Sequence, residues 1–292
     1  MKVRVYTPEQ PADHGDALRA FASGCDSETR VFMHDVTDPY EECDIAVVFG
    51  VGKDRVPVSY DRARIINEHR KRKKSVIIIE KGFVDRDRYF AVGLNGLNGQ
   101  ADFRNRGMPP DRAAKSGFAL QPLRETGRHI LVIGQIPWDA NVQDSDHSAW
   151  CRGAVDYMLG NTDDRIVIFR PHPLAPADLD YGIRTKGRLR VSTGSLANDL
   201  RNCHAVITFS SNTGVDAMVA GIPVIASSEM SMVWNAARHN FAEACDDGFC
   251  FSKTQRLKWW NDINYAQWNL DEIADGDAWR HLMRPLDEKH NG

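Results

Sequence analysis

The segment from Ile207 to Ala226, ITFSSNTGVDAMVAGIPVIA, constrains the fold more than any other part of the sequence. We interpret it as a buried strand, a Ser-Ser-Asn-Thr-Gly turn, a short helix that ends at a glycine, and a second buried strand. Two buried strands joined through a helix are typical of a parallel sheet covered by helices. A helix that begins at a strand end also points N–H groups and partial positive charge at that edge, which favours a phosphate ligand.

Short apolar runs alternate with amphipathic segments along the rest of the chain in the same way. In the first half we expect strands near Val3–Tyr6, Thr29–Met33, Ile45–Phe49 and Val76–Glu80, and helices near Asp13–Ala22 and Tyr60–Lys73. In the second half we expect strands near Ile130–Gly134, Ile166–Arg170, Leu189–Ser192, Ala205–Phe209 and Pro223–Ala226, and helices near Ala149–Leu159, Leu196–Asn202 and Gly214–Ala220. The pattern predicts an α/β protein with two doubly wound, Rossmann-like units in tandem.

The irregular stretch Gly117–Arg128 predicts where the first unit ends and the second begins. We therefore expect an N-terminal domain over residues 1–122 and a second domain over 123–254. Residues 255–292 are rich in tryptophan and read as a helical tail that packs back across the domains. Residues 93–110 contain too much glycine and asparagine for a regular element, and loops of this length are often functional.

The composition excludes several classes of protein. The 292 residues carry a formal net charge of −3, so the molecule as a whole has no electrostatic attraction to nucleic acid. No apolar run approaches the roughly 20 residues that span a bilayer, and the first residues read as a strand and not as a signal peptide. Six cysteines without a C-x-x-C pair indicate reduced thiols and predict no metal site. We expect a cytoplasmic protein that contacts no membrane.

Two strand-end loops in the second half carry polar side chains. Gly134–Ala140 follows a buried strand and offers Gln135 and Asp139 to a ligand, although Asp139 could equally cap a helix. Further along, Arg170-Pro171-His172-Pro173 holds an arginine and a histidine on a backbone that the prolines stiffen. Arg170 and His172 can face one phosphate with charge-assisted hydrogen bonds. The alternative is a stiff turn whose histidine satisfies a neighbouring carbonyl.

The turn within Ile207–Ala226 adds a third set of polar groups. Ser210, Ser211, Asn212 and Thr213 supply hydroxyls, an amide and the N–H groups of the helix they begin. Asp216 lies one turn further on and could reach a ribose diol. It could instead only complement the helix dipole.

Carboxylates in the first half are candidates for a general base. Glu80 ends an apolar strand, where its carboxylate is expected at the edge of the sheet in a partly dry environment. Asp85 is the other candidate, with Asp87 close by. Each of them could instead pair with Arg86 or Arg88, as surface carboxylates commonly do.

Three motifs follow one another at strand ends of the second half: Gly134-Gln135 with Asp139, then Arg170-Pro171-His172-Pro173, then Ser210-Ser211-x-x-Gly214-x-Asp216-Ala217 with Ala220-Gly221-x-Pro223-Val224. In this order they resemble the motifs of the capsule-polysaccharide (Kdo-transferase-like) glycosyltransferase superfamily over residues 130–226. The resemblance extends more loosely to the E-x-G-F stretch at Glu80–Phe83. Glu80–Phe103 and Tyr265–Trp268 also look like stand-alone relatives that phages carry.

The resemblance implies a GT-B architecture, with two Rossmann-like domains that face each other across a cleft. It implies that Arg170, His172 and the turn from Ser210 to Thr213 hold the donor phosphate, while Gln135 borders the sugar or phosphates. The chain departs from the family at Asp216, where glutamate is usual, and this puts the ribose contact in doubt. No bound cofactor or metal is implied; the co-substrate is a nucleotide-sugar, with a UDP-sugar favoured and a CMP-sugar as the alternative.

The phage-type resemblance favours a 5-hydroxymethylated pyrimidine in DNA as acceptor. An enzyme that acts on DNA needs a basic, partly aromatic face and would flip its target base out of the duplex. We expect Arg104 and Arg106 on that face, with Trp138 and Asp139 also on the acceptor side and Phe103 or Trp138 stacking on the base. Further basic clusters lie at Arg70–Lys74, Arg112 with Lys115, and Arg256–Trp260; the first reads equally well as a solvated helix end.

Two other functions remain open. A polysaccharide glycosyltransferase would need no basic face, and a non-catalytic nucleotide- or nucleic-acid-binding module would use the same motifs without Glu80 or Asp85. A dinucleotide-dependent oxidoreductase is disfavoured because no G-x-G-x-x-G follows a strand. The sequence leaves the sugar, the stereochemical outcome and the oligomeric state undetermined.

Overall fold

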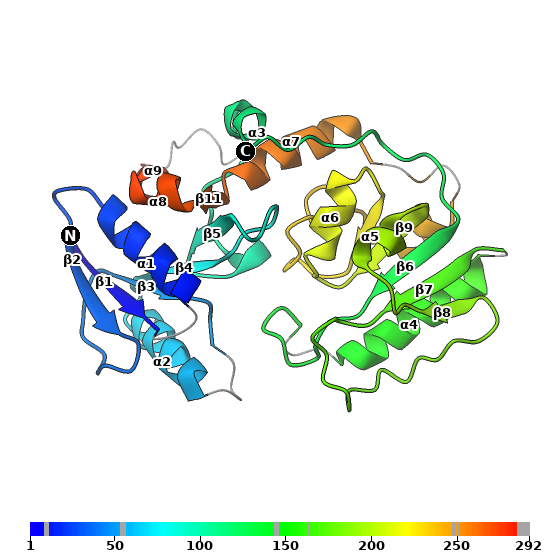
Figure 1. Ribbon diagram of the computed structural model, residues 1–292, viewed down its shortest axis with the longest axis horizontal. Coiled ribbons are helices and arrows are strands. Elements are labelled where there is room, and N and C mark those ends of the chain that lie inside the picture. The colour runs from blue at the N-terminus through cyan, green and yellow to red at the C-terminus, as the bar shows by residue number, and fades with distance from the viewer. Residues whose placement is uncertain are drawn as a thin grey trace. The chain divides into compact units, whose positions relative to one another are not determined.

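The chain forms two compact units in the computed structural model, which describes residues 1–8, 12–52, 57–142, 146–162, 164–246, 249 and 251–284. Unit 1 comprises Met1–Met108 and Asp262–Gly292, and unit 2 comprises Pro109–Asn261 (Figure 1). The division therefore falls earlier than the boundary expected after residue 122. Residues 109–128 go with unit 2 because Gln121 N–H donates to Val219 O (2.9 Å) and Arg124 N–H donates to Gly221 O (2.8 Å).

Unit 1 is built on a six-stranded sheet in the order β11-β5-β4-β3-β1-β2. Four strands are parallel: β1 (Lys2–Thr7), β2 (Arg30–Asp35), β3 (Ile45–Phe49) and β4 (Ser75–Lys81). The other two were not expected from the sequence: β5 (Tyr89–Leu94) runs antiparallel to β4, and β11 (Gln267–Asn269) runs antiparallel to β5. The four parallel strands confirm the predicted strands, and the sheet as a whole is mixed.

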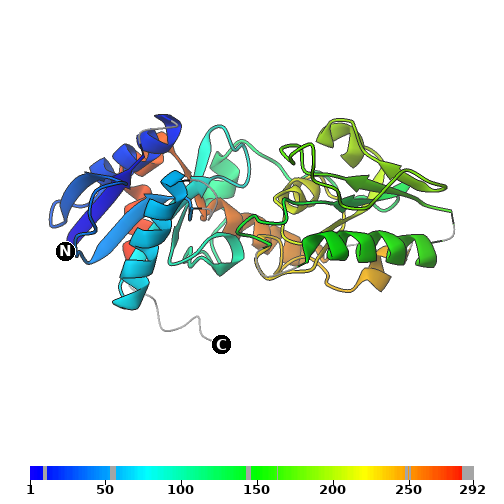
Figure 2. The same ribbon diagram turned by 90° about the horizontal axis from the view of Figure 1, so that it is seen from below.

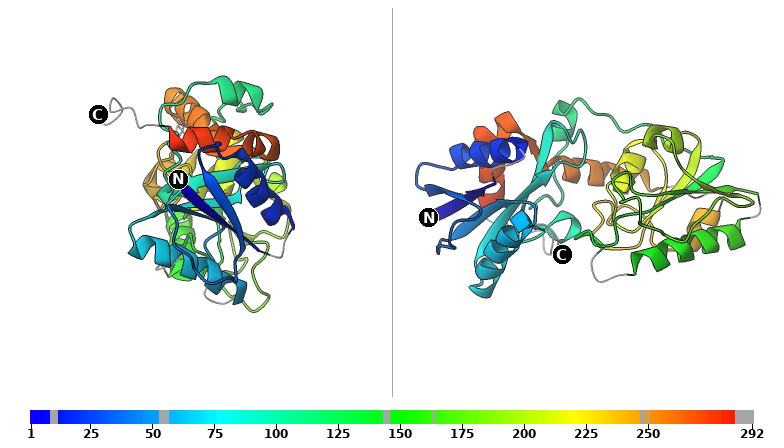
Figure 3. Two further views of the ribbon diagram at one scale, coloured as in Figure 1. Left: turned by 90° about the vertical axis from the view of Figure 1, so that its left-hand side faces the viewer. Right: turned by 60° about the horizontal axis from the view of Figure 1, so that its bottom comes forward.

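Helices cover both faces of this sheet. Successive side chains of a strand point to opposite faces, and here the side chains on both faces are apolar. On one face α1 (Ala12–Gly24), α8 (Leu270–Ala274) and α9 (Asp277–Met283) bury Leu18, Phe21 and Trp279 against the strands (Figure 3). On the other face α2 (Pro57–Lys71) buries Ile65 and Ile66. A short 3₁₀ helix, η1 (Asn98–Gln100), follows β5 within the stretch expected to be irregular.

Unit 2 is a five-stranded parallel sheet in the order β10-β9-β6-β7-β8. Its strands match those predicted from the sequence to within a few residues: β6 (His129–Ile133), β7 (Ile166–Arg170), β8 (Leu189–Val191), β9 (Cys203–Thr208) and β10 (Val224–Ala226). Its helices are α3 (Asp111–Lys115), α4 (His147–Asn161), α5 (Leu196–Leu200), α6 (Thr213–Val219) and the 3₁₀ helix η2 (Phe241–Cys245). Figure 2 shows α4 along one face of the sheet, where Val155 and Met158 pack on Ile130.

The residues of the expected tail, 255–292, are divided between the two units. Helix α7 (Lys253–Asn264) begins in unit 2 and ends in unit 1, and the chain then supplies β11, α8 and α9 to unit 1. Trp259 and Trp260 are buried in unit 2, whereas Trp268 and Trp279 are buried in the core of unit 1. Within the described residues, every helix is too short or too polar to span a bilayer.

Candidate functional site

The strand order of unit 2 defines where a ligand would bind. Strand β6 pairs with β7 on one side and with β9 on the other, so the direction of winding reverses between β6 and β9 (Figure 1). Ligands of doubly wound domains bind in the crevice beyond the carboxyl ends of the strands at such a switch point. Gly134 and Gln135 follow β6 at this edge, and Ser210 to Thr213 follow β9. The topology therefore brings together two of the three predicted loops.

Gln135 joins these two loops. Its side-chain Oε1 accepts the Ser210 N–H (2.9 Å), and its Nε2 donates to Ser210 Oγ (3.1 Å). Ser210 Oγ also donates to Asn141 O (2.9 Å). Gln135 and Ser210 are 5% and 4% exposed. The Gln135 amide thus bonds within the protein and joins the two loops, and the expectation that Gln135 borders the sugar or phosphates of the donor stays a prediction.

Two buried residues that the sequence analysis did not find hold the Gln135 backbone. Gln135 N–H donates to His147 Nε2 (2.8 Å), and the Tyr181 hydroxyl donates to Gln135 O (2.8 Å). Burial lowers the pKa of His147 to about 4 and raises the pKa of Tyr181 to about 12, so both groups are neutral near pH 7. The Tyr181 hydroxyl also takes a hydrogen bond from the His172 backbone, which ties the β6 loop to the β7 loop. One sequence signal for His147 was its position directly after Asp146, the N-cap of α4.

Arg170 has a partner that sequence reasoning missed. Its Nη1 lies 2.7 Å from Asp199 Oδ2 and donates to Gly194 O (2.7 Å). Ser192 Oγ donates to the same carboxylate oxygen (2.6 Å). The Arg170 and Asp199 side chains are 16% and 10% exposed. Arg170 therefore braces the end of β7 against α5 and the loop after β8, and its contact with a donor phosphate stays a prediction.

His172 keeps a tautomer suited to donating a hydrogen bond. Leu174 N–H donates to His172 Nδ1 (3.1 Å), so the neutral ring carries its proton on Nε2. The side chain is half-buried at the end of β7. The prolines on either side stiffen this turn, as the sequence predicted.

The turn after β9 is an ordered set of hydroxyl groups. Ser211 N–H donates to Thr208 Oγ1 (2.9 Å), and Ser211 Oγ accepts the Thr213 N–H (3.2 Å). Ser211, Asn212, Thr213 and Asp216 are all half-buried. Helix α6 approaches the sheet closely at Gly214, where a Cβ atom would lie 3.3 Å from the side chain of Thr208 in β9. The predicted polar turn is confirmed as a structure, and its ligand stays a prediction.

Trp138 and Asp139 lie in the loop after Gln135. Trp138 is 40% exposed, and Asp139 Oδ1 accepts the Asn141 N–H (3.1 Å). Asp139 does not cap a helix, because α4 begins at His147 with Asp146 as its cap. Both residues belong to unit 2, so their assignment to the acceptor side stays a prediction.

In unit 1 Glu80 lies at the carboxyl edge of the sheet, as predicted, beside charged groups. Both Glu80 and Arg62 lie against Gly50. A Cβ atom added to Gly50 would be 3.3 Å from Glu80 Oε2 and 3.1 Å from Arg62 Nη1. Arg62 donates to Phe49 O (2.7 Å) and interacts electrostatically with Glu80. Glu80 Oε1 also accepts the N–H of Lys81 (2.9 Å). A half-buried carboxylate therefore lies at the end of β3 and β4 with a half-buried arginine next to it.

His14 is a further member of this cluster that the sequence did not reveal. Its ring stacks on Phe49 with 3.7 Å between centroids, and its Nδ1 is buried without a hydrogen-bond partner. Burial lowers the pKa of His14, and the nearby Arg62 and Lys81 lower it further. Lys81 Nζ pairs with Asp13 Oδ2 (2.5 Å), and that lysine lowers the pKa of Asp13. His14 is therefore neutral near pH 7 and, like Glu80, interacts electrostatically with Arg62.

The other residues expected in unit 1 take different positions. Asp85 is exposed in the turn between β4 and β5, where its φ is +48° and its C=O accepts the Arg88 N–H. Phe103 is buried against Phe83, with 5.8 Å between ring centroids, so it cannot stack on a flipped base as expected. Arg104 is half-buried and bonds to the backbone of Arg284. Arg106 is exposed.

Some residues of the predicted basic clusters are paired or buried within the protein. Arg72 and Lys71 pair with Glu68, and Lys74 pairs with Glu42. Arg256 is 5% exposed and donates to Met218 O and Val219 O. Arg106, Lys115 and Lys258 remain exposed, and the basic face that an enzyme acting on DNA would need stays a prediction.

No protein-family model matches the chain, and no curated protein matches it by sequence. Among solved structures, a β-Kdo 2,4 transferase, KpsC from Thermosulfurimonas dismutans, is similar with a TM-score of 0.55 at 14% identity, over 85% of this chain and 90% of that one. A KpsC β-Kdo 2,7 transferase from the same organism gives a TM-score of 0.49 at 11% identity, over 97% and 100%. The first likeness spans both units and confirms the GT-B fold.

Proposed function

We propose that this protein is a glycosyltransferase that uses a nucleotide-sugar donor. The observation that carries the proposal is the switch-point crevice of unit 2, where Gln135 clamps the β6 loop to a turn rich in hydroxyls, within a GT-B fold. The fold match to a Kdo transferase supports it.

In this proposal the crevice binds the donor phosphate through neutral groups. The hydroxyls of Ser211 and Thr213 donate to the phosphate oxygens, and His172 Nε2–H adds a further donor. The phosphate brings its own charge, and these half-buried neutral donors stabilise it without an opposing charge. Gln135 and Arg170 act as positioning residues that fix the distances between the loops. A UDP-sugar is the favoured donor and a CMP-sugar the alternative.

Glu80 is the proposed general base. The acceptor hydroxyl loses its proton to Glu80 as its oxygen forms a bond to the anomeric carbon of the sugar. The bond from that carbon to the nucleotide's phosphate oxygen breaks, and the electron pair leaves with the nucleotide. Glu80 is preferred to Asp85 because it is half-buried beside Arg62, whereas Asp85 is exposed.

The acceptor that the geometry favours is a saccharide. Arg104 and Arg256, expected on a DNA-binding face, are occupied by the protein's own backbone, and Arg72 is paired with Glu68. A saccharide is recognised by neutral hydrogen bonding and aromatic surface and needs no such face.

The test is a transfer assay with a panel of UDP-, CMP-, GDP- and TDP-sugars against oligosaccharides, plain DNA and hydroxymethylated DNA. We expect nucleotide release that depends on an oligosaccharide. Transfer to hydroxymethylated DNA alone would overturn the saccharide acceptor and restore the DNA acceptor. Binding of nucleotide-sugar without transfer to any acceptor would favour a non-catalytic nucleotide-binding module.

A further inference from the structure

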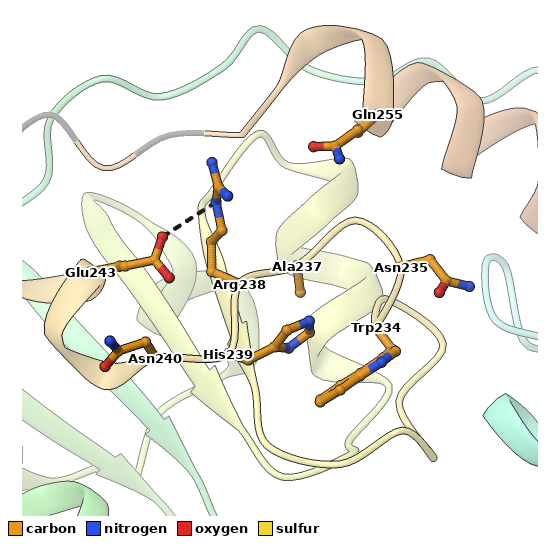
Figure 4. A pocket seen from close by; sticks show the side chains of 8 residues that line it. All are labelled: Trp234, Asn235, Ala237, Arg238, His239, Asn240, Glu243 and Gln255. Atoms are coloured by element: carbon orange, nitrogen blue, oxygen red, sulfur yellow. Dashed lines mark ion pairs between the residues drawn. The ribbon is translucent and has the colours of Figure 1, made fainter.

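A polar hollow lies past the last strand of unit 2, apart from the crevice between β6 and β9. It encloses about 580 Å³, within the range of small-ligand sites. Eight residues line it (Figure 4): Trp234, Asn235, Ala237, Arg238, His239, Asn240, Glu243 and Gln255. A second hollow of about 420 Å³ shares Trp234, His239 and Asn240 with it and reaches Ala226 and Ser227 at the end of β10.

An aromatic pair forms one wall of this hollow. The Trp234 and His239 rings stack with 3.6 Å between their centroids and an interplanar angle of 25° (Figure 4). His239 Nδ1 lies 3.1 Å from Ala226 O, and because a carbonyl only accepts, that nitrogen carries the proton. The bond fixes the imidazole, and the imidazole in turn fixes the indole face.

The polar wall is anchored to the sheet. Arg238 N–H donates to Val224 O (3.0 Å), and Arg238 O accepts the Ala226 N–H (2.9 Å), so this residue bridges to β10. The Arg238 guanidinium points towards Glu243, with 3.4 Å between Nε and Oε2, and both side chains remain partly exposed at 48% and 38%. A strand-like anchor of this kind holds binding groups in place before a ligand arrives.

These groups match the chemistry of a saccharide. An indole face packs on the C–H face of a pyranose, and the amides of Asn235, Asn240 and Gln255 can bond to ring hydroxyls as donor or acceptor. Arg238 adds a donor fork that suits a carboxylate or a hydroxyl pair. A nucleoside fits this place less well, because doubly wound domains hold the ribose at the end of the second strand, here β7, on the opposite side of the switch point from β10.

We propose that the hollow lined by Trp234, Arg238 and His239 is a saccharide-binding subsite for a pyranose ring. The inference rests on the proposed glycosyltransferase function and extends it with a site for sugar recognition. The pyranose belongs either to the donor or to the acceptor. A change in the affinity for the nucleotide-sugar indicates the donor, and a change in the KM for the oligosaccharide indicates the acceptor.

The experiment compares wild type with Trp234→Ala, Trp234→Phe and Arg238→Ala. Arg280→Ala is the matched control, since Arg280 forms an exposed pair with Asp277 in unit 1. Thermal unfolding establishes whether each variant is folded. If Trp234→Ala does not fold, Trp234→Phe, which retains an aromatic face, takes its place in the comparison. Titration calorimetry gives the affinity for UDP and CMP alone and for the nucleotide-sugar, and kinetics give the KM for the oligosaccharide.

We expect Trp234→Ala and Arg238→Ala to bind nucleotide alone as tightly as wild type does. Either the affinity for the nucleotide-sugar should fall, or the KM for the oligosaccharide should rise, by about tenfold or more. Loss of nucleotide-sugar affinity places the donor sugar in the hollow, and a raised KM for the oligosaccharide places the acceptor there. Equal losses for nucleotide and nucleotide-sugar, or no loss at all, would overturn the subsite.

The outcome for the subsite can be separated from the outcome for the enzyme. If wild type transfers no sugar, the proposed function fails, and saturation-transfer NMR with free oligosaccharides then decides the subsite. Binding by wild type that Trp234→Ala abolishes would support it, and absence of binding by wild type would overturn it.

Discussion

The carboxyl edges of the two sheets use opposite chemistry on a similar framework. In unit 1 the edge at β3 and β4 is charged, with Glu80 beside Arg62, and Lys81 paired with Asp13. In unit 2 the loops after β6 and β9 are joined by neutral groups, the Gln135 amide and the hydroxyl and N–H of Ser210. A charged edge suits proton transfer, and a neutral crevice suits a ligand that brings its own charge. The contrast divides the proposed reaction into activation of an acceptor and binding of a donor.

The largest expected effect follows from removing the charge of Glu80. Glu80→Gln should reduce the transfer rate by about 10² to 10⁴-fold, because the acceptor hydroxyl then loses its base. Steady-state kinetics with saturating donor measures this loss. Asp85→Asn should change the rate little. If Asp85→Asn is the inactive variant, Glu80 is not the base.

Substitution of Arg170 tests whether its charge stabilises the fold of unit 2. Arg170→Ala should lower the free energy of unfolding by about 3–5 kcal/mol, because it leaves Asp199 buried without its cation. Denaturant unfolding measures the loss. Arg280→Ala, which breaks an exposed ion pair, should cost no more than about 0.5 kcal/mol. A stable Arg170→Ala protein with a selective loss of donor binding would return Arg170 to the phosphate site.

Acid should destabilise both units through one buried histidine in each. Burial lowers the pKa of His147 in unit 2 to about 4, and burial with Lys74 and Arg72 lowers that of His69 in unit 1 to about 4, against 6.5 for an unfolded chain. The unfolded chain therefore binds more protons between pH 6.5 and 4, and the free energy of unfolding falls as the pH falls through that window. Each histidine accounts for up to about 3 kcal/mol, fully present above pH 6.5.

The pH effect can be assigned to a single residue by denaturant unfolding at pH 7, 5.5 and 4. His147→Gln keeps an acceptor for the Gln135 N–H but cannot be protonated, so its stability should depend less on pH than that of wild type. An unchanged slope would contradict the role of His147.

The smallest expected effect comes from breaking the hydrogen bonds between Gln135 and Ser210. Gln135→Ala leaves the buried Ser210 N–H without its acceptor and should lower the free energy of unfolding by about 1–3 kcal/mol. The KM for the donor should rise while the KM for the acceptor stays unchanged, because only the unit 2 crevice loses its spacing. A rise in both constants would mean that the two edges are not separate in function.

The sequence allowed the parallel strands of both units to be predicted, because runs such as Ile45–Phe49 and Cys203–Thr208 are apolar throughout. It did not reveal β5 or β11, because a glycine-rich loop follows β5 and β11 is only three residues long. At the site, the strand-end positions of Glu80 and Arg170 were predictable. The partner of Arg170 was not, since Asp199 lies on a different element, 29 residues further along the chain.

The shared helix α7 has a consequence for how the protein is made. Strand β11 comes from the end of the chain, and Gln267 Oε1 accepts the N–H groups of Phe83 (2.7 Å) and Val84 (2.9 Å), just after Glu80. On a ribosome that adds about 5–20 residues per second, Gln267 follows Phe83 by roughly 10 to 40 s. Unit 2 is continuous in sequence and can fold during that interval. The N-terminal unit is therefore begun first and completed after unit 2, and its edge near Glu80 is assembled only once Gln267 has been synthesised.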